Sequence, residues 1–210
     1  LAPWRTPFAI APFDRIGTHH FEPALSKAFA MHRAEIMAIA NSPARPTLAN
    51  TILALEKAGS LLDRVARVFS NLESTDSTDQ LAAVARRMSP RFAAHESAIL
   101  LNTSLFKRVD DLHARRDTLK LDAEARRLLE RTRLAFVRAG AKLKPAQRKR
   151  VAAIKERLAT LVTQFMQNVL KDEQSWQLVL AGENDLAGLP EAFRAAAARV
   201  ATERGHSGKH

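Results

Sequence analysis

Apolar residues recur every three or four positions along most of the chain, which is the spacing of helices that bury one face. The first stripe predicts a helix from about Pro23 to Asn41, which the segment NSPARP ends. Pro23 suits the first turn, where its missing N–H is not needed. The residues of this stripe are Leu25, Phe29, His32, Ile36 and Ile39.

The stretch PTLANTILALEKAG, residues 46–59, supports two conflicting predictions about where a helix ends. Thr47 can cap a second helix with its side-chain oxygen, and Gly59 should end that helix. The apolar stripe nevertheless continues in phase past Gly59. We therefore expect an unbroken helix in which Gly59 is buried at a close crossing with another helix. The stripe consists of Leu48, Ile52, Leu55, Gly59, Leu62, Ala66 and Phe69.

Further stripes predict five more helices. One begins at Thr78 or Asp79, and Pro90 should kink or split it. Its stripe is Leu81, Val84, Met88, Phe92, His95 and Ile99. The others run from Ser104 to about Arg116, from a cap at Asp122 to Gly140, from Pro145 to about Lys171, and from Pro190 to Glu203. The helix from Ser104 carries the inward residues Leu105, Val109 and Leu112. The helix from Asp122 carries Leu128, Leu129, Thr132 and Phe136. The helix from Pro145 carries a heptad-like seam of Val151, Ile154, Leu158, Leu161, Phe165 and Val169.

The predicted fold class is all-α, with about seven helices and at most one short strand near 176–180. We expect a helical N-terminal domain over 1–175, with an extended lead over 1–17, and the truncated start of a following segment over 176–210. Trp4, Phe8 and Phe13 alternate with prolines in the lead. They are expected to anchor it on the helices, and a peptide-like docking arm is the alternative.

Composition narrows the class of protein. The chain of 210 residues is 46% apolar, which supports a packed core. It has no cysteine, which excludes disulfides and thiolate metal sites. No apolar run is long enough to span a membrane, and LAPWRTPFAIAPFDRI does not read as a signal peptide. We expect a cytoplasmic protein without a membrane partner.

Positive charge is concentrated in the second half of the chain. The net charge of +11 divides into +2 for residues 1–100 and +9 for residues 101–210. The block Lys142–Arg157 holds seven basic residues against Glu156. A solvated helix face is the preferred interpretation, and a surface for nucleic acid or an acidic protein is the alternative.

No catalytic motif is present. The chain lacks a phosphate-binding loop, a dinucleotide fingerprint and a G-x-S-x-G elbow. The nearest approach to H-E-x-x-H is His95-Glu96-Ser97-Ala98-Ile99, and Ile99 cannot ligate a metal. His95 is therefore expected to be a hydrogen-bonded core histidine. We predict no catalytic, cofactor-binding or metal-binding residue in this chain.

The other histidines are interpreted as structural or exposed. His19 and His20 are adjacent, so their side chains should point apart and serve a capping or surface role. His32 and His113 have no partner four residues away. His206 and His210 are four apart, but they lie in a loose polar tail and form at best a chance chelate.

Several segments together resemble the N-terminal part of the thimet oligopeptidase family of zinc metallopeptidases, with the bacterial peptidyl-dipeptidase branch nearest and oligopeptidase A next. They are APFDRI at 11–16, HFEPALSKAF at 20–29, AEIMAIANSPARPTLANTILALEKAG at 34–59, LFKRV at 105–109, LLERTRLAFVRAGAKL at 128–143 and DLAGLP at 185–190. Leu48 and Ala49 depart from the pattern, where Phe and Glu would be expected.

The resemblance implies a mostly helical parent enzyme whose zinc is held by an H-E-x-x-H helix and a later Glu in a C-terminal half. This chain would be the non-catalytic domain that forms one wall of the channel for short peptides. Its partners would be its own catalytic half and those peptides, and zinc would be a cofactor of the parent only. The alternatives are a stand-alone basic helical module that binds nucleic acid or an acidic protein, and a helical scaffold in an oligomer.

Overall fold

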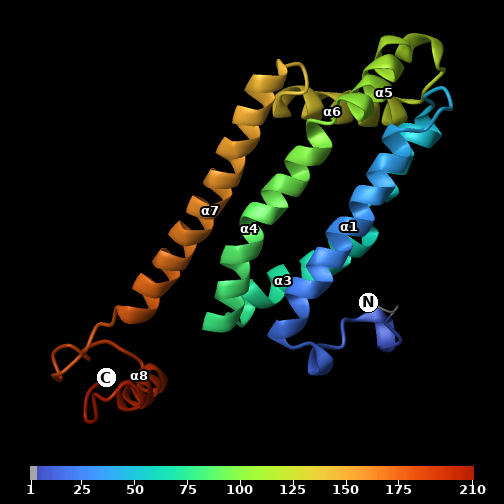
Figure 1. The fold of residues 1–210 in the computed structure, drawn as a ribbon. Helices are drawn as coiled ribbons and strands as arrows, with labels where there is room; N and C mark the ends of the chain where they lie inside the picture. Colours follow the sequence, from blue (N-terminus) through green and yellow to red (C-terminus); the bar gives the residue numbers. More distant parts are fainter. Residues whose placement is uncertain (1–3) are drawn as a thin grey trace. The chain divides into compact units, whose positions relative to one another are not determined.

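The computed structural model describes residues 4–210, and within that range the fold is helical without a strand (Figure 1). The longer helices are α1 Phe21–Ala40, α3 Ser60–Thr75, α4 Asp79–Leu100, α5 Thr103–Ala114, α6 Ala123–Ala139, α7 Pro145–Ser175 and α8 Glu191–Glu203. Residues 176–180 form neither a helix nor a strand, and Leu180 exchanges two backbone hydrogen bonds with His210, of 2.8 and 3.0 Å. The prediction of an all-α fold is confirmed.

The chain groups into two compact units, one ending at Phe165 and the other beginning at Met166. The helix α7 crosses this division. The second unit holds α8 and the turn-rich segment before it. Spatial grouping is not evidence of independent folding, so the domain boundary expected after residue 175 stays a prediction.

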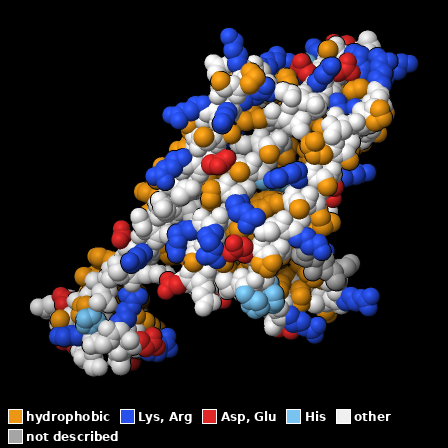
Figure 2. Space-filling view, in the orientation of Figure 1, with side chains coloured by type: hydrophobic (Ala, Val, Ile, Leu, Met, Phe, Trp, Pro, Cys, Tyr) orange, Lys and Arg blue, Asp and Glu red, His pale blue; other side chains and the backbone are white. Residues whose placement is uncertain are grey.

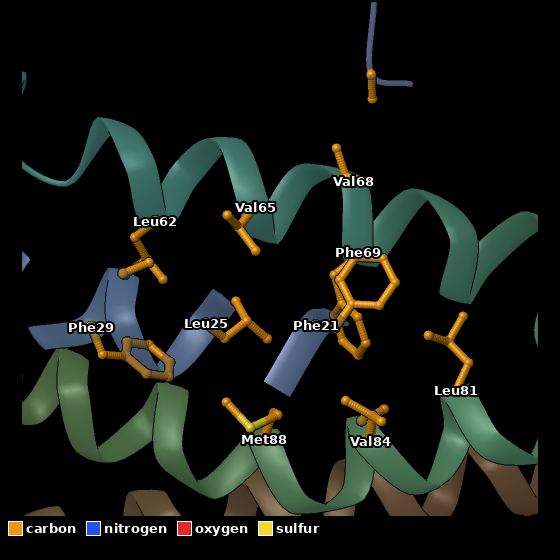
Figure 3. Close-up of a cluster of buried hydrophobic side chains, with 13 residues drawn as sticks. Phe21, Leu25, Phe29, Leu62, Val65, Val68, Phe69, Leu81, Val84 and Met88 are labelled. Atoms are coloured by element: carbon orange, nitrogen blue, oxygen red, sulfur yellow. The ribbon is translucent and has the colours of Figure 1, made fainter. Parts of the chain in front are cut away.

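The first core lies between α1, α3 and α4. Figure 3 shows Phe21 and Leu25 of α1 between Val65 and Phe69 of α3 and Met88 of α4. The rings of Phe21 and Phe69 meet edge-on, with centroids 5.2 Å apart. Burying side chains of this size stabilises a fold by about 1.5–3 kcal/mol each.

The second core lies where the C-terminal part of α1 meets α5, α6 and the π-helical segment η4, Leu48–Leu53. Ile52, Leu105, Leu112 and Leu129 are all fully buried there. The helix α1 contributes Leu25 to the first core and Ile36 to the second, so it joins the two.

Most predicted helix ends are confirmed. Thr47, Thr78 and Asp122 each accept a hydrogen bond from a backbone N–H in the first turn of the helix that follows. Gly140 closes α6 in the left-handed conformation, with φ of 106°. The helix expected from Ser104 instead begins at Thr103, because the side chain of Asn102 caps it.

The helix α4 is not split at Pro90, contrary to one expected outcome. The buried residues Met88 and His95 lie on either side of the proline. Packing on both sides of Pro90 offsets the cost of the backbone hydrogen bond that proline removes.

The prediction of an unbroken helix through Gly59 is wrong. The short helix α2, Ala54–Lys57, ends before Ala58, whose backbone is extended, and Gly59 has φ of 77°. The break has a packing reason. Leu55 and Ala58 pack on the second core, whereas Leu62 belongs to the first, so the chain turns at Gly59 to pass from one to the other.

Gly59 is nevertheless buried against another helix, as expected. A Cβ at this position would lie 2.7 Å from ring atoms of His32 on α1. The Gly59 N–H donates a hydrogen bond of 2.7 Å to the carboxylate of Glu35, also on α1. The apolar stripe continues on both sides of Gly59 because the segment before it and the helix after it each bury an apolar face, one in the second core and one in the first.

Candidate functional site

A pair of histidines, one buried and one half-buried, joins α1 to α4. Nδ1 of His32 and Nε2 of His95 are 3.0 Å apart, so one ring donates a hydrogen bond to the other. His95 is 5% exposed, and its ring lies 4.8 Å from the ring of Phe29, centroid to centroid. The prediction of a hydrogen-bonded core histidine is confirmed. His32 has a partner on another helix, which a search within one helix could not reveal.

The environment lowers the pKa of both rings and so favours their neutral forms. Burial lowers the pKa of His95 to about 4, helped by His32 and by the positive charge of Arg33. Burial also lowers the pKa of His32, although the carboxylate of Glu35 opposes this shift. In a pair of neutral imidazoles, an N–H of one ring can donate to the unprotonated nitrogen of the other. Two imidazolium rings in contact would instead repel each other.

The pair lines a cavity of about 580 Å³ between α3, α4 and the first part of α7. Ser89 of α4 donates to the carbonyl oxygen of Ala159 on α7 at 2.9 Å, and Thr163 donates to the Ser89 hydroxyl at 2.7 Å. Nδ1 of His95 is buried without a hydrogen-bond partner. Within residues 4–210, no three His, Asp or Glu side chains are grouped so that they could hold a metal ion.

A second buried polar group is one that the sequence patterns did not predict. Arg108 of α5 is 7% exposed and donates to the carbonyl oxygens of Ser42 and Ala44, at 2.9 and 3.0 Å. It also donates to the side chains of Asn50 and Thr51. The sequence does carry a sign of this burial, because Arg108 comes three residues after Leu105 and so lies on the inward face of its helix. Its role is to fix the loop between α1 and η4.

The remaining histidines hold structural or surface positions. His20 accepts a hydrogen bond from the Gly17 N–H at 3.0 Å, which confirms a capping role. The expectation that His19 and His20 point apart is wrong, since their ring centroids are 3.9 Å apart. His113 is partly buried, and burial lowers its pKa. His206 lies 2.8 Å from the side-chain amide of Gln177.

The aromatic lead is anchored only in part. Trp4 packs against the first core, and the guanidinium of Arg64 lies 5.3 Å from the centre of its ring. Phe8 and Phe13, however, are 95% and 45% exposed. One aromatic residue therefore holds the lead on the helices, while the other two face solvent.

The basic block Lys142–Arg157 covers the turn before α7 and the first turns of that helix. Its charged side chains are exposed or half-buried, and none forms an ion pair within the described part of the chain. Lys and Arg side chains are scattered over the face seen in Figure 2 rather than gathered into one patch. This arrangement favours the interpretation as a solvated face.

The helix α7 presents apolar side chains to solvent. None of its residues is buried, contrary to the expectation that its seam packs in a layer of helices. Leu158, Leu161 and Phe165 are 53%, 42% and 65% exposed, and Ile154 and Val162 are also exposed. Soluble proteins rarely leave a continuous apolar stripe uncovered, so this surface has the character of an interface.

Comparison with known proteins identifies relatives for nearly the whole chain, although no family model matches it. It is 40% identical to a dipeptidyl carboxypeptidase of Escherichia coli (strain K12) over 203 residues, which are 97% of this chain and 30% of the relative. It is 26% identical to oligopeptidase A of Salmonella typhimurium over 206 residues, 98% of this chain and 30% of that protein. A probable cytosolic oligopeptidase A of Arabidopsis thaliana is 22% identical over 199 residues, 95% of this chain and 28% of the relative.

The chain spans about 30% of the length of the curated relatives that it matches. The similarity nevertheless extends over almost all of its own residues, including the segments that carried the resemblance. The two named groups are those expected from that resemblance, in the same order of identity. The chain is therefore a homologue of part of the dipeptidyl carboxypeptidases and oligopeptidases A, and its resemblance to the thimet oligopeptidase family is confirmed.

Proposed function

We propose that the chain is the N-terminal, non-catalytic domain of a zinc metallopeptidase of the peptidyl-dipeptidase type. The observation that carries the proposal is the identity of 40% with a dipeptidyl carboxypeptidase over 97% of this chain but only 30% of that protein. The parent protein would hydrolyse short peptides in the cytoplasm. This domain would form one wall of the channel that admits them.

The proposal assigns the chemistry to another part of the parent. In the parent, zinc would make a bound water acidic enough to attack the peptide bond. The described residues of this chain do not fit zinc, since they bring no three suitable side chains together. No step of hydrolysis is therefore assigned to them, and their contribution is to shape access to the site.

The exposed stripe of α7 supports a partner within the parent. Leu158 and Phe165 are seven residues apart, about two helical turns, so they lie on one face together with Leu161. Covering such side chains stabilises an interface by about 25 cal/mol for each Å² of apolar area removed from water. We assign this face to contact with the catalytic half of the parent.

The first experiment is to read the gene beyond the codon for His210. An H-E-x-x-H motif several hundred residues downstream is expected. The longer protein should release C-terminal dipeptides from an N-blocked tetrapeptide, and a zinc chelator should abolish that release. The 210-residue chain alone should release none. A stop codon directly after His210, or dipeptide release by this chain alone, would contradict the proposal.

The second experiment tests the α7 face in the longer protein. Replacing Leu158 and Phe165 together by Ser should lower its melting temperature and activity, whereas in the 210-residue chain the same change should have little effect. Phe8→Ser is the matched control, because Phe8 is 95% exposed on the lead. If the α7 pair is as harmless as Phe8→Ser in the longer protein, this face is not the interface with the catalytic half.

A further inference from the structure

A cavity lies under the N-terminal lead, away from the His32–His95 pair. It measures about 1000 Å³, at the upper end of the size range of small-molecule sites. The lead forms one side, and α1 and α3 form the other. Its apolar wall includes Trp4, Ile16, Phe21, Val65 and Val68.

The lead is held in place over this cavity by its own contacts. Ala11 is buried in the first core, and Trp4 and Ile16 pack against the same core. The contact between Arg64 and the ring of Trp4 ties the lead to α3. The cavity is therefore a feature of the packed fold.

The polar lining of the cavity is strongly cationic. It contains Arg5, Arg15, Lys27 and Arg64, against the single carboxylate of Asp14. Asp14 pairs with Arg15 at 3.5 Å, and both side chains are largely exposed. No hydrogen bond or ion pair joins Arg5 or Lys27 to another described residue. Arg5 and Lys27 therefore have no carboxylate partner among the described residues, and a bound anion would offset their positive charge.

From this combination we infer that the cavity binds a small organic anion with an apolar body and a carboxylate at one end. Trp4 and Val68 contact the body, and Arg5 and Lys27 receive the carboxylate. A short peptide with a free C-terminus and a free aliphatic acid both have this chemistry. The inference concerns a site within this chain and does not depend on the activity of a parent enzyme.

Trp4 supplies a local probe of binding. The chain has two tryptophans, and Trp176 is 71% exposed in the second unit. In a Trp176→Phe background, N-acetyl-Leu-Phe and decanoate should each be titrated at low salt while Trp4 fluorescence is followed. Binding of at least one probe with a saturating change is expected. Binding should be about tenfold weaker for the uncharged amide of the probe, because a charge-assisted hydrogen bond is lost.

The decisive variant is Arg5→Gln with Lys27→Gln, both exposed positions that contribute nothing to the cores. It should weaken binding about tenfold. The matched control is Lys149→Gln with Arg150→Gln, which removes the same charge from exposed positions on α7. Circular dichroism melts should show that both variants remain folded.

The probes also distinguish the two sources of the ligand. Stronger binding of the acetylated dipeptide supports a peptide ligand, and stronger binding of decanoate supports an aliphatic acid. Either result supports the site, provided that the cavity variant weakens binding and the α7 variant does not. Failure of both probes to bind, or equal loss in the two variants, would overturn the inference.

Discussion

Replacing Gly59 by Ala should destabilise the fold through two separate effects. The first is backbone strain, because φ of 77° costs a residue with a Cβ about 1–2 kcal/mol. The second is crowding, because the new Cβ would lie 2.7 Å from the ring of His32. Overpacking of this kind costs about 1–3 kcal/mol. The loss in the free energy of unfolding should therefore total about 2–5 kcal/mol.

This loss can be measured as a change in melting temperature. For a chain of this length, 1 kcal/mol corresponds to about 2–4 °C, so a loss of about 2–5 kcal/mol should lower the melting temperature of Gly59→Ala by about 4–20 °C. Gly188→Ala is the matched control, because Gly188 has a similar φ of 80° but no heavy atom within 4 Å of its added Cβ. That variant should show only the strain.

A double-mutant cycle isolates the crowding. In a His32→Ala background, Gly59→Ala should lower the free energy of unfolding by less than it does in the original protein. The difference should be about 1–3 kcal/mol, the cost of the overpacking against His32. Two results would refute the reasoning. One is a melting temperature for Gly59→Ala no lower than that of Gly188→Ala. The other is a cost that is unchanged when the ring of His32 is absent.

Four further predictions rest on other features. The pKa of His95 is about 4 in the folded state and 6.5 in the unfolded state, so the unfolded state binds more protons between pH 4 and pH 6.5. The melting temperature should therefore fall as the pH falls from 6.5 to 4. His95→Leu should flatten that dependence. Arg108→Ala should lower the free energy of unfolding by about 3 kcal/mol in urea titrations, since it removes the hydrogen bonds of a buried guanidinium to the loop carbonyl oxygens of Ser42 and Ala44, and Arg108→Lys should recover only part. Calorimetry on a tag-free sample should detect no zinc site tighter than stray histidines such as His206 provide; a stoichiometric sub-micromolar site would contradict this. Duplex DNA should bind the block Lys142–Arg157 weakly and dissociate at physiological salt, and sequence-selective binding that survives such salt would favour the alternative function.

Local rules predicted much of this fold from the sequence. The stripes through Leu25, Leu105 and Leu129 placed buried faces on three helices, since apolar side chains at helical spacing have one stable way to leave water. Thr47 and Asp122 marked helix starts, because their oxygens satisfy backbone N–H groups within the same segment. Each of these interactions is complete within a few residues of the chain.

The candidate site could not be predicted in the same way. Histidine at position 95 was correctly expected in the core, but its partner His32 is 63 residues away on another helix. Arg108 likewise meets the carbonyl groups of a loop far from it in the chain. A pattern within one helix states which face is buried, and it does not state which other element buries it.

Gly59 and α7 show where tertiary structure alone decided the outcome. The stripe through Gly59 keeps its phase, so periodicity could not separate one helix facing one core from two helices facing two cores. The seam of α7 has the pattern of a buried face, yet Leu158 and Phe165 are exposed. Sequence alone determined that these residues favour burial, because side-chain chemistry sets that preference. Whether and against what they are buried depends on which surfaces meet in space, and that is a property of the assembled fold.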